Sequence, residues 1–123
     1  MIKMTYCLRR KPGMTWDEFS NYWRDTHAPL VRERQEILGI KRYVQVRTWQ
    51  NPSLHAAFQR RNDGAPEPFD GIAELWYDDD FSTRPRTEES ARAARELLDD
   101  ERNFIDLANS PLWMGHETEV IGS

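Results

Sequence analysis

Apolar and polar side chains alternate along the start of the chain. The apolar positions are Ile2, Met4, Tyr6 and Leu8. This alternation puts all four on one face of an extended chain, which predicts a strand over residues 2–9. Pro12 and Gly13 follow it with turn chemistry.

The next segment has the periodicity of a helix. Thr15 and Glu18 have the spacing of a capping box, so the helix should begin directly after Thr15. On a helical wheel one arc collects Trp16, Phe19, Trp23, Leu30 and Ile37, with His27 among them. Pro29 lacks an N–H and its ring clashes with the carbonyl of residue 25, which predicts a kink or break beside the inward-facing His27. Gly39 should end the helix.

The remaining pattern completes a small α+β fold. It predicts a strand over residues 40–49, a surface loop over 51–69, a strand over 71–77, a helix over about 87–100, a short helical turn over 100–107 and a last strand over 112–121. The order β-α-β-β-α-β indicates a ferredoxin-like single domain over residues 1–123, with two helices on one face of a four-stranded antiparallel sheet.

The other face of this sheet has no helix to cover it. We expect large side chains such as Tyr43, Trp49 and Trp113 to point that way. An uncovered apolar face in a small protein is usually buried by association, and a second copy of the chain is the simplest partner. The sequence therefore predicts a homodimer.

Composition and missing motifs exclude several classes of protein. A net charge of −4 argues against nucleic acid as a partner. No apolar run reaches transmembrane length, and the N-terminus has no signal-peptide pattern. The lone Cys7 suits a reducing cytoplasm, where we expect the protein. The three histidines lack paired metal-ligand spacing and no nucleotide or haem motif is present, so we expect neither a metal nor a cofactor.

His27 is the strongest candidate for chemistry. Its ordinary pKa lies near neutrality, so it can accept or donate a proton. A histidine on an apolar helix face must either find a hydrogen-bond partner or line a cavity. The alternative is a core histidine bonded to backbone groups freed by Pro29.

Two carboxylates are further candidates. Glu74 lies in the middle of a strand, where a charge needs a ligand or a partner such as an arginine. Asp106 could orient His27 or cap a turn. The side chains expected to bind a small hydrophobic or aromatic molecule are Tyr6, Tyr22, Trp23, Tyr43, Trp76 and Phe104.

Several segments together resemble the EthD family. The most specific is Tyr22-Trp23 followed by His27-Ala28-Pro29-Leu30. Residues 10–15, residues 69–76 and the late Asp100-Glu101-x-x-Phe104-Ile105-Asp106 also fit, whereas the tip of the 51–69 loop does not. The resemblance implies a dimeric α/β barrel in which each subunit holds a cavity between sheet and helices, with His27 at that cavity.

The resemblance also narrows the function. It implies a cofactor-independent lyase or isomerase, dehydratase- or cyclase-like, with His27 as general acid and base on a small aromatic, lactone or polyketide-type compound. Tyr6, Trp23 and Trp76 would supply apolar walls. Two alternatives stay open: a non-catalytic ligand-binding or accessory protein of an oxidative degradation or biosynthetic pathway, and a cofactorless oxygenase.

Overall fold

The structure is a computed structural model that describes residues 1–122. Its sheet contains β1 (Ile2–Leu8), β2 (Arg42–Arg47), β3 (Gly71–Tyr77) and β4 (Leu112–Gly115). The strands lie in the order β2-β3-β1-β4 and every neighbouring pair is antiparallel. This confirms the α+β class and the four-stranded antiparallel sheet. β4 is shorter than the predicted strand over 112–121, because it pairs with β1 only from Lys3 to Tyr6.

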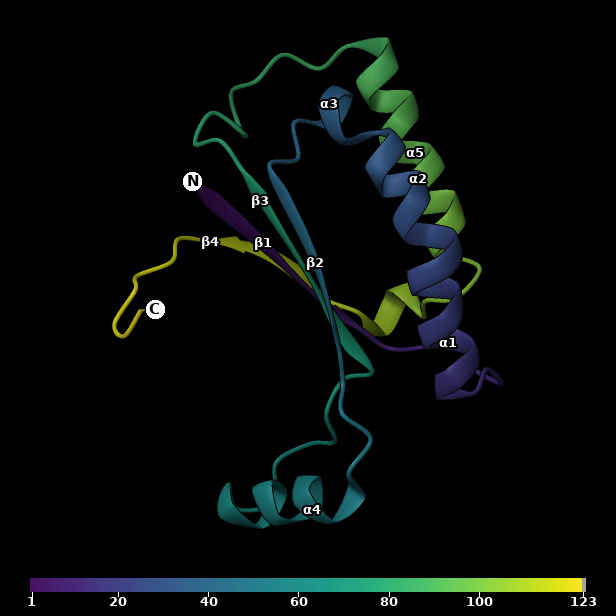
Figure 1. The fold of residues 1–123 in the computed structure, drawn as a ribbon, viewed down its shortest axis with the longest axis vertical. Helices are drawn as coiled ribbons and strands as arrows, with labels where there is room; N and C mark the ends of the chain where they lie inside the picture. The colour runs from purple at the N-terminus through teal and green to yellow at the C-terminus, as the bar shows by residue number, and fades with distance from the viewer. Residues whose placement is uncertain (123) are drawn as a thin grey trace.

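The helices on the sheet are α1 (Trp16–Tyr22), α2 (Ala28–Glu33), α3 (Gln35–Leu38) and α5 (Glu88–Glu101), and they cover one face of it (Figure 1). The predicted capping box begins α1, since the Thr15 side chain accepts from the Glu18 N–H and the Glu18 side chain accepts from the Thr15 N–H. Gly39 ends α3 in the left-handed conformation with φ of 68°.

The predicted break at Pro29 is a π-helical turn, η1 (Trp23–His27). The Ala28 N–H bonds to the Trp23 carbonyl, five residues back, so the helix is wider just before the proline. The Trp23 carbonyl also accepts a hydrogen bond from Gln45 Nε2 at 2.9 Å. A further irregularity at Arg34 separates α2 from α3.

Residues 51–69 were expected to form a loop, and this prediction was wrong. They contain α4 (Pro52–Arg61), which extends away from the sheet (Figure 1). The Asn51 side chain caps α4 by accepting from the Leu54 N–H, and Pro52 occupies the first turn, where its missing N–H costs nothing. The predicted helical turn over 100–107 is also displaced: α5 continues to Glu101, and a short 3₁₀ turn, η2, follows at Leu107–Asn109.

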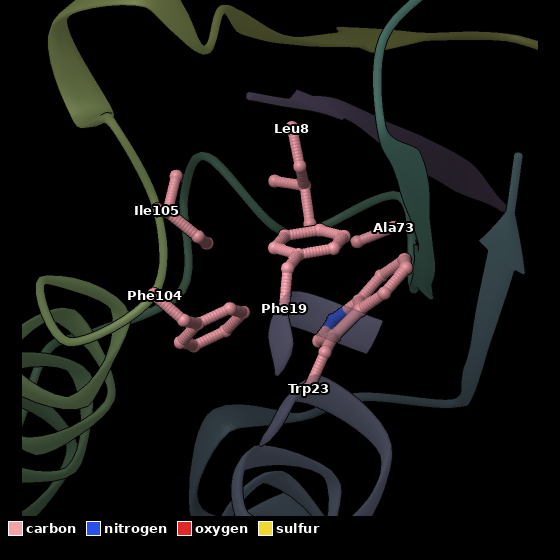
Figure 2. Packing of buried hydrophobic residues seen from close by; sticks show 6 residues of the cluster. All are labelled: Leu8, Phe19, Trp23, Ala73, Phe104 and Ile105. Carbon is pink, nitrogen blue, oxygen red and sulfur yellow. The ribbon is translucent and has the colours of Figure 1, made fainter. Parts of the chain in front are cut away.

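The core below the helices is largely aromatic. Figure 2 shows Leu8, Phe19, Trp23, Ala73, Phe104 and Ile105 packed together. The Phe19 ring centroid lies 5.5 Å from that of Trp23 and 5.8 Å from that of Phe104. Since Phe19, Trp23 and His27 are all buried, the apolar arc of the first helix faces inward as predicted.

Side chains on the helix-free face alternate with those of the core. Val46 and Trp113 lie on this face and are 44% and 51% exposed. Tyr43 was expected there and is not: its hydroxyl accepts a hydrogen bond from Trp23 Nε1 at 3.2 Å, on the helical side. Trp49 follows the end of β2 and is exposed.

Candidate functional site

A cavity of about 630 Å³ lies between the sheet and the helices. Its walls come from β1, β2, β3, α2, α3 and α5, and from the segment that joins β3 to α5. Most of the lining is aliphatic or aromatic, and its volume falls in the range of sites for small organic ligands.

His27 is the last residue of the π-helical turn and lines this cavity. It is buried, and its ring packs on Phe104 at 5.0 Å between centroids. Its Nδ1 lies 2.8 Å from Oδ2 of Asp100, on the last turn of α5. Nε2 has no hydrogen-bond partner among residues 1–122. It is not fully enclosed by protein atoms, so a small molecule can reach it.

Asp100 is held as a carboxylate by its donors. Tyr22 donates its hydroxyl to Oδ1 at 2.6 Å, and Asn103 Nδ2 donates to the Tyr22 hydroxyl oxygen at 3.1 Å. Burial alone would raise the pKa of Asp100, but the bonds from Tyr22 and His27 bring that pKa below its usual value. An ionised Asp100 accepts the proton on Nδ1, and this fixes the tautomer with a lone pair on Nε2.

The pKa of His27 is lowered by burial, and the nearby Asp100 offsets only part of this effect. The imidazole is therefore neutral at physiological pH. A neutral imidazole with an unbonded Nε2 at a cavity wall can act as a general base.

A second polar pair lies at the same end of the cavity. Tyr6 donates its hydroxyl to Oε1 of Glu101 at 2.9 Å, and both residues line the cavity. Burial raises the pKa of Glu101, so this carboxyl retains its proton to higher pH than an ordinary glutamate. Burial and the Glu101 charge together raise the pKa of Tyr77, across the cavity, to about 12. Glu101 is thus a carboxyl in an apolar setting that favours its protonated form.

Three predicted ligand-binding residues line the cavity with His27, namely Tyr6, Trp23 and Tyr43. The Tyr43 hydroxyl accepts bonds from Trp23 Nε1 and from Gln45 Nε2, at 3.2 and 3.0 Å. Its own proton has no acceptor among residues 1–122 and can be donated to a ligand oxygen. Tyr22 and Phe104 lie behind His27 instead, where they support Asp100 and the imidazole.

The other predicted site residues lie elsewhere. Asp106 does not orient His27: its carboxylate accepts a bond from Asn109 Nδ2 at 2.7 Å, within the 3₁₀ turn that follows. Glu74 forms an ion pair with Lys3 on the helix-free face. This agrees with the expectation that a charge in the middle of a strand needs a partner, although the partner is a lysine and not an arginine. Trp76 is also on that face, where its ring centroid lies 4.9 Å from Lys3 Nζ, and it does not line the cavity.

Asp100 and Glu101 were not predicted as site residues from the sequence. One signal was available, because Glu101 continues the stripe of Ala94 and Leu97 at helical spacing and so must face inward. A second signal is the acidic end of α5, since carboxylates are unfavourable at the negative end of a helix dipole. Three consecutive acids from Asp99 to Glu101, with no basic residue in that turn, suggest a use other than helix stability.

Among residues 1–122 no three His, Cys, Asp or Glu side chains lie together as potential metal ligands. No helix in the same range has both the length and the apolar character needed to cross a bilayer.

Comparisons with known proteins agree with the fold. The model of the EthD domain matches residues 11–108. Decarboxylase AgnL1 from Paecilomyces divaricatus is 24% identical over 119 residues, which are 96% of this chain and 79% of that protein. An EthD family protein from Bacillus halodurans C-125 has a similar structure, with a TM-score of 0.58 and 22% identity over 96% of this chain and all of that chain. An EthD-like protein from Ralstonia eutropha JMP134 has a TM-score of 0.53 and 20% identity over 94% of this chain and 89% of that one.

Proposed function

Because the chain belongs to the EthD family, we propose that it is a cofactor-independent lyase or isomerase acting on a small aromatic, lactone or polyketide-type compound. The observation that carries the proposal is the state of His27. Its Nδ1 is held by Asp100 at 2.8 Å, and its Nε2 is unbonded at the wall of a cavity of about 630 Å³. This is the arrangement that a general base requires.

His27 and Glu101 divide the proton transfers between them. In the elimination of water, Nε2 of His27 takes a proton from a carbon next to a carbonyl group. The C–H electron pair forms the new double bond, the C–O bond breaks, and Glu101 gives its proton to the departing hydroxyl, which leaves as water. Tyr43 donates a hydrogen bond to the carbonyl oxygen as negative charge develops on it.

The name of the relative from Paecilomyces divaricatus, Decarboxylase AgnL1, supports the lyase class. In a decarboxylation the bond to the carboxylate breaks, CO₂ leaves, and its electron pair remains on the ligand carbon. That carbon must then receive a proton, and Glu101 is a suitable donor because burial raises the pKa of its carboxyl. Glu101 therefore serves as proton donor in either reaction, whereas removal of a proton by His27 belongs to the elimination of water.

The test compares His27→Gln with His116→Gln, which changes an exposed histidine outside the cavity. Both variants and the wild type are assayed on hydroxylated aromatic carboxylic acids and lactones, with product identified by mass spectrometry. We expect His27→Gln to lower turnover about 10²–10⁴-fold and His116→Gln to leave it unchanged.

Three outcomes would contradict the proposal. Unchanged turnover in a folded His27→Gln protein removes the catalytic role of His27. Tight binding without turnover by the wild type favours a ligand-binding or accessory protein. Turnover that consumes O₂ in step with product favours a cofactorless oxygenase.

A further inference from the structure

The cavity has two chemically different ends. His27 and Glu101 line one end, and His27 there is only 5% exposed. Arg84 and Arg86 line the other end, where both are exposed to solvent, so we call it the mouth. We propose that the cavity binds an elongated apolar ligand whose anionic group is held at the mouth by Arg84 and Arg86 while its opposite end reaches His27. The inference deepens the proposed function, on which it rests for the identity of the reacting end.

The distance between the two ends follows from α5, which runs along the cavity. Ser90 lines it near the mouth and Glu101 lines it near His27, eleven residues further along the helix. At a rise of about 1.5 Å per residue this corresponds to about 16 Å. A single aromatic ring does not span this length, whereas a fused-ring or chain-extended compound does.

The walls between the ends are apolar. Val31 comes from α2, Leu75 from β3 and Leu97 from α5, and all three line the cavity. A ligand body that passes between them must therefore be largely hydrophobic, because an unpaired polar group would lose its hydration there. Polar groups on the ligand belong at its two ends.

The mouth carries two positively charged side chains. Neither Arg84 nor Arg86 forms an ion pair with a carboxylate of residues 1–122, although Glu36 lines the same end. The chain as a whole is acidic, with a net charge of −4. Two unpaired guanidinium groups at the entrance to an apolar cavity suit an anion that arrives with an apolar body.

Arg84 is also seated on the body of the protein. Its guanidinium lies over Gly39, at the end of α3, where a Cβ atom would fall 1.5 Å from Nη1. Gly39 thus has two properties that a residue with a side chain would lose: it adopts φ of 68° to end the helix, and it leaves space for the arginine. A guanidinium can bind a carboxylate through two parallel hydrogen bonds.

These features together define a ligand class. The ligand is an aromatic or polyketide-type acid, with a carboxylate or similarly charged group about 16 Å from the end on which His27 acts. The anionic group takes no part in the chemistry. It selects and orients the ligand, because binding energy at a remote group positions the reacting end.

The experiment uses 1-pyrenebutanoic acid and its methyl ester, which have the same apolar body and differ in charge. Binding is followed by pyrene fluorescence. The proteins are the wild type, Arg84→Gln/Arg86→Gln, and Arg92→Gln/Arg95→Gln, a control with the same change of charge at exposed positions of α5 outside the cavity. We expect the wild type to bind the acid about tenfold more tightly than the ester, with a preference that falls as salt is added. The mouth variant should lose this preference and keep its affinity for the ester, and the control should behave as the wild type.

Equal affinity of the wild type for acid and ester overturns the inference, as does failure of the acid to bind saturably. Both results are measured on the wild type, so neither depends on whether a variant folds. A similar loss of preference in the control pair also overturns it, because the effect would then be one of net charge alone. These failures are separate from failure of the proposed function, which is judged by turnover in His27→Gln and not by charge preference in the wild type.

Discussion

Replacement of Asp100 by asparagine should reverse the tautomer of His27 and so remove its basic nitrogen from the cavity. The reason lies in the Tyr22 hydroxyl, which donates to Asp100 Oδ1 at 2.6 Å and accepts from Asn103 Nδ2 at 3.1 Å. With asparagine at position 100, only the amide oxygen can satisfy the Tyr22 O–H. The amide NH₂ must then face His27, whose Nδ1 becomes an acceptor and whose proton moves to Nε2.

The size of the effect has two parts. Loss of a charge-assisted hydrogen bond to the imidazolium that forms during the reaction is worth about 1.5–3 kcal/mol, or about 10–10²-fold in rate. Loss of the basic tautomer adds to this, and the total should reach about 10³–10⁴-fold in kcat/KM. Asp100 also offsets part of the burial effect on His27, so Asp100→Asn should lower the pKa of His27 further. The acid limb of the residual activity therefore moves to lower pH.

The assay adds Tyr22→Phe to both backgrounds. In the Asp100→Asn protein, Tyr22→Phe removes the O–H that holds the amide oxygen, so the amide can turn its oxygen toward His27 and activity should recover in part. In the wild type the same change removes a donor that helps to keep Asp100 ionised, so activity should fall or stay level. Nitrogen NMR shifts of His27 report the tautomer directly. An Asp100→Asn protein with wild-type kcat/KM, or equal effects of Tyr22→Phe in both backgrounds, would refute the reasoning.

Two further predictions concern other parts of the molecule. Burial raises the pKa of Glu101 above its unfolded value, so the folded state loses stability as pH rises from about 4.5 through that raised pKa. By calorimetry, Glu101→Gln should therefore raise Tm by about 3–6 °C at pH 7.5 and change Tm little at pH 4.5. In activity assays the same variant should show lower turnover. The helix-free face exposes Val46 and Trp113, so we expect it to be buried in a homodimer. Light scattering at tens of micromolar protein should give twice the chain mass for the wild type and the mass of one chain for Trp113→Lys. A monomeric wild type contradicts the expectation.

The elements that the sequence predicts well are those whose signal is local. The alternation from Ile2 to Leu8 and the capping box of Thr15 and Glu18 depend on neighbours only a few residues away. α4 was missed although Asn51 and Pro52 carry a cap signal, because the ten residues of this helix lack a continuous apolar stripe. The helix extends away from the sheet, so it does not pack on the core and needs no apolar stripe.

For the site, the sequence identifies His27 by its place on an apolar helix face but does not identify its partner. Asp100 and Asp106 are both near Phe104 in the chain, and the choice between them depends on where α5 ends. Once α5 continues to Glu101, Asp100 lies on its last turn beside His27, whereas Asp106 begins a separate turn. Contacts between residues 73 positions apart depend on helix packing, which periodicity alone does not determine.

The adjacent residues Asp100 and Glu101 show how one helix turn can supply two different acids. Successive residues on a helix point about 100° apart, so Asp100 faces the π-helical turn and Glu101 faces the sheet. Asp100 there meets the donors Tyr22 and His27, which lower its pKa, while Glu101 meets the apolar cavity and the single hydroxyl of Tyr6, and its pKa rises. Two carboxyl groups whose environments shift their pKa values in opposite directions are suited to opposite tasks. In the proposed reaction, Asp100 orients the base and Glu101 gives the proton. Both positions depend on the fact that α5 continues to Glu101.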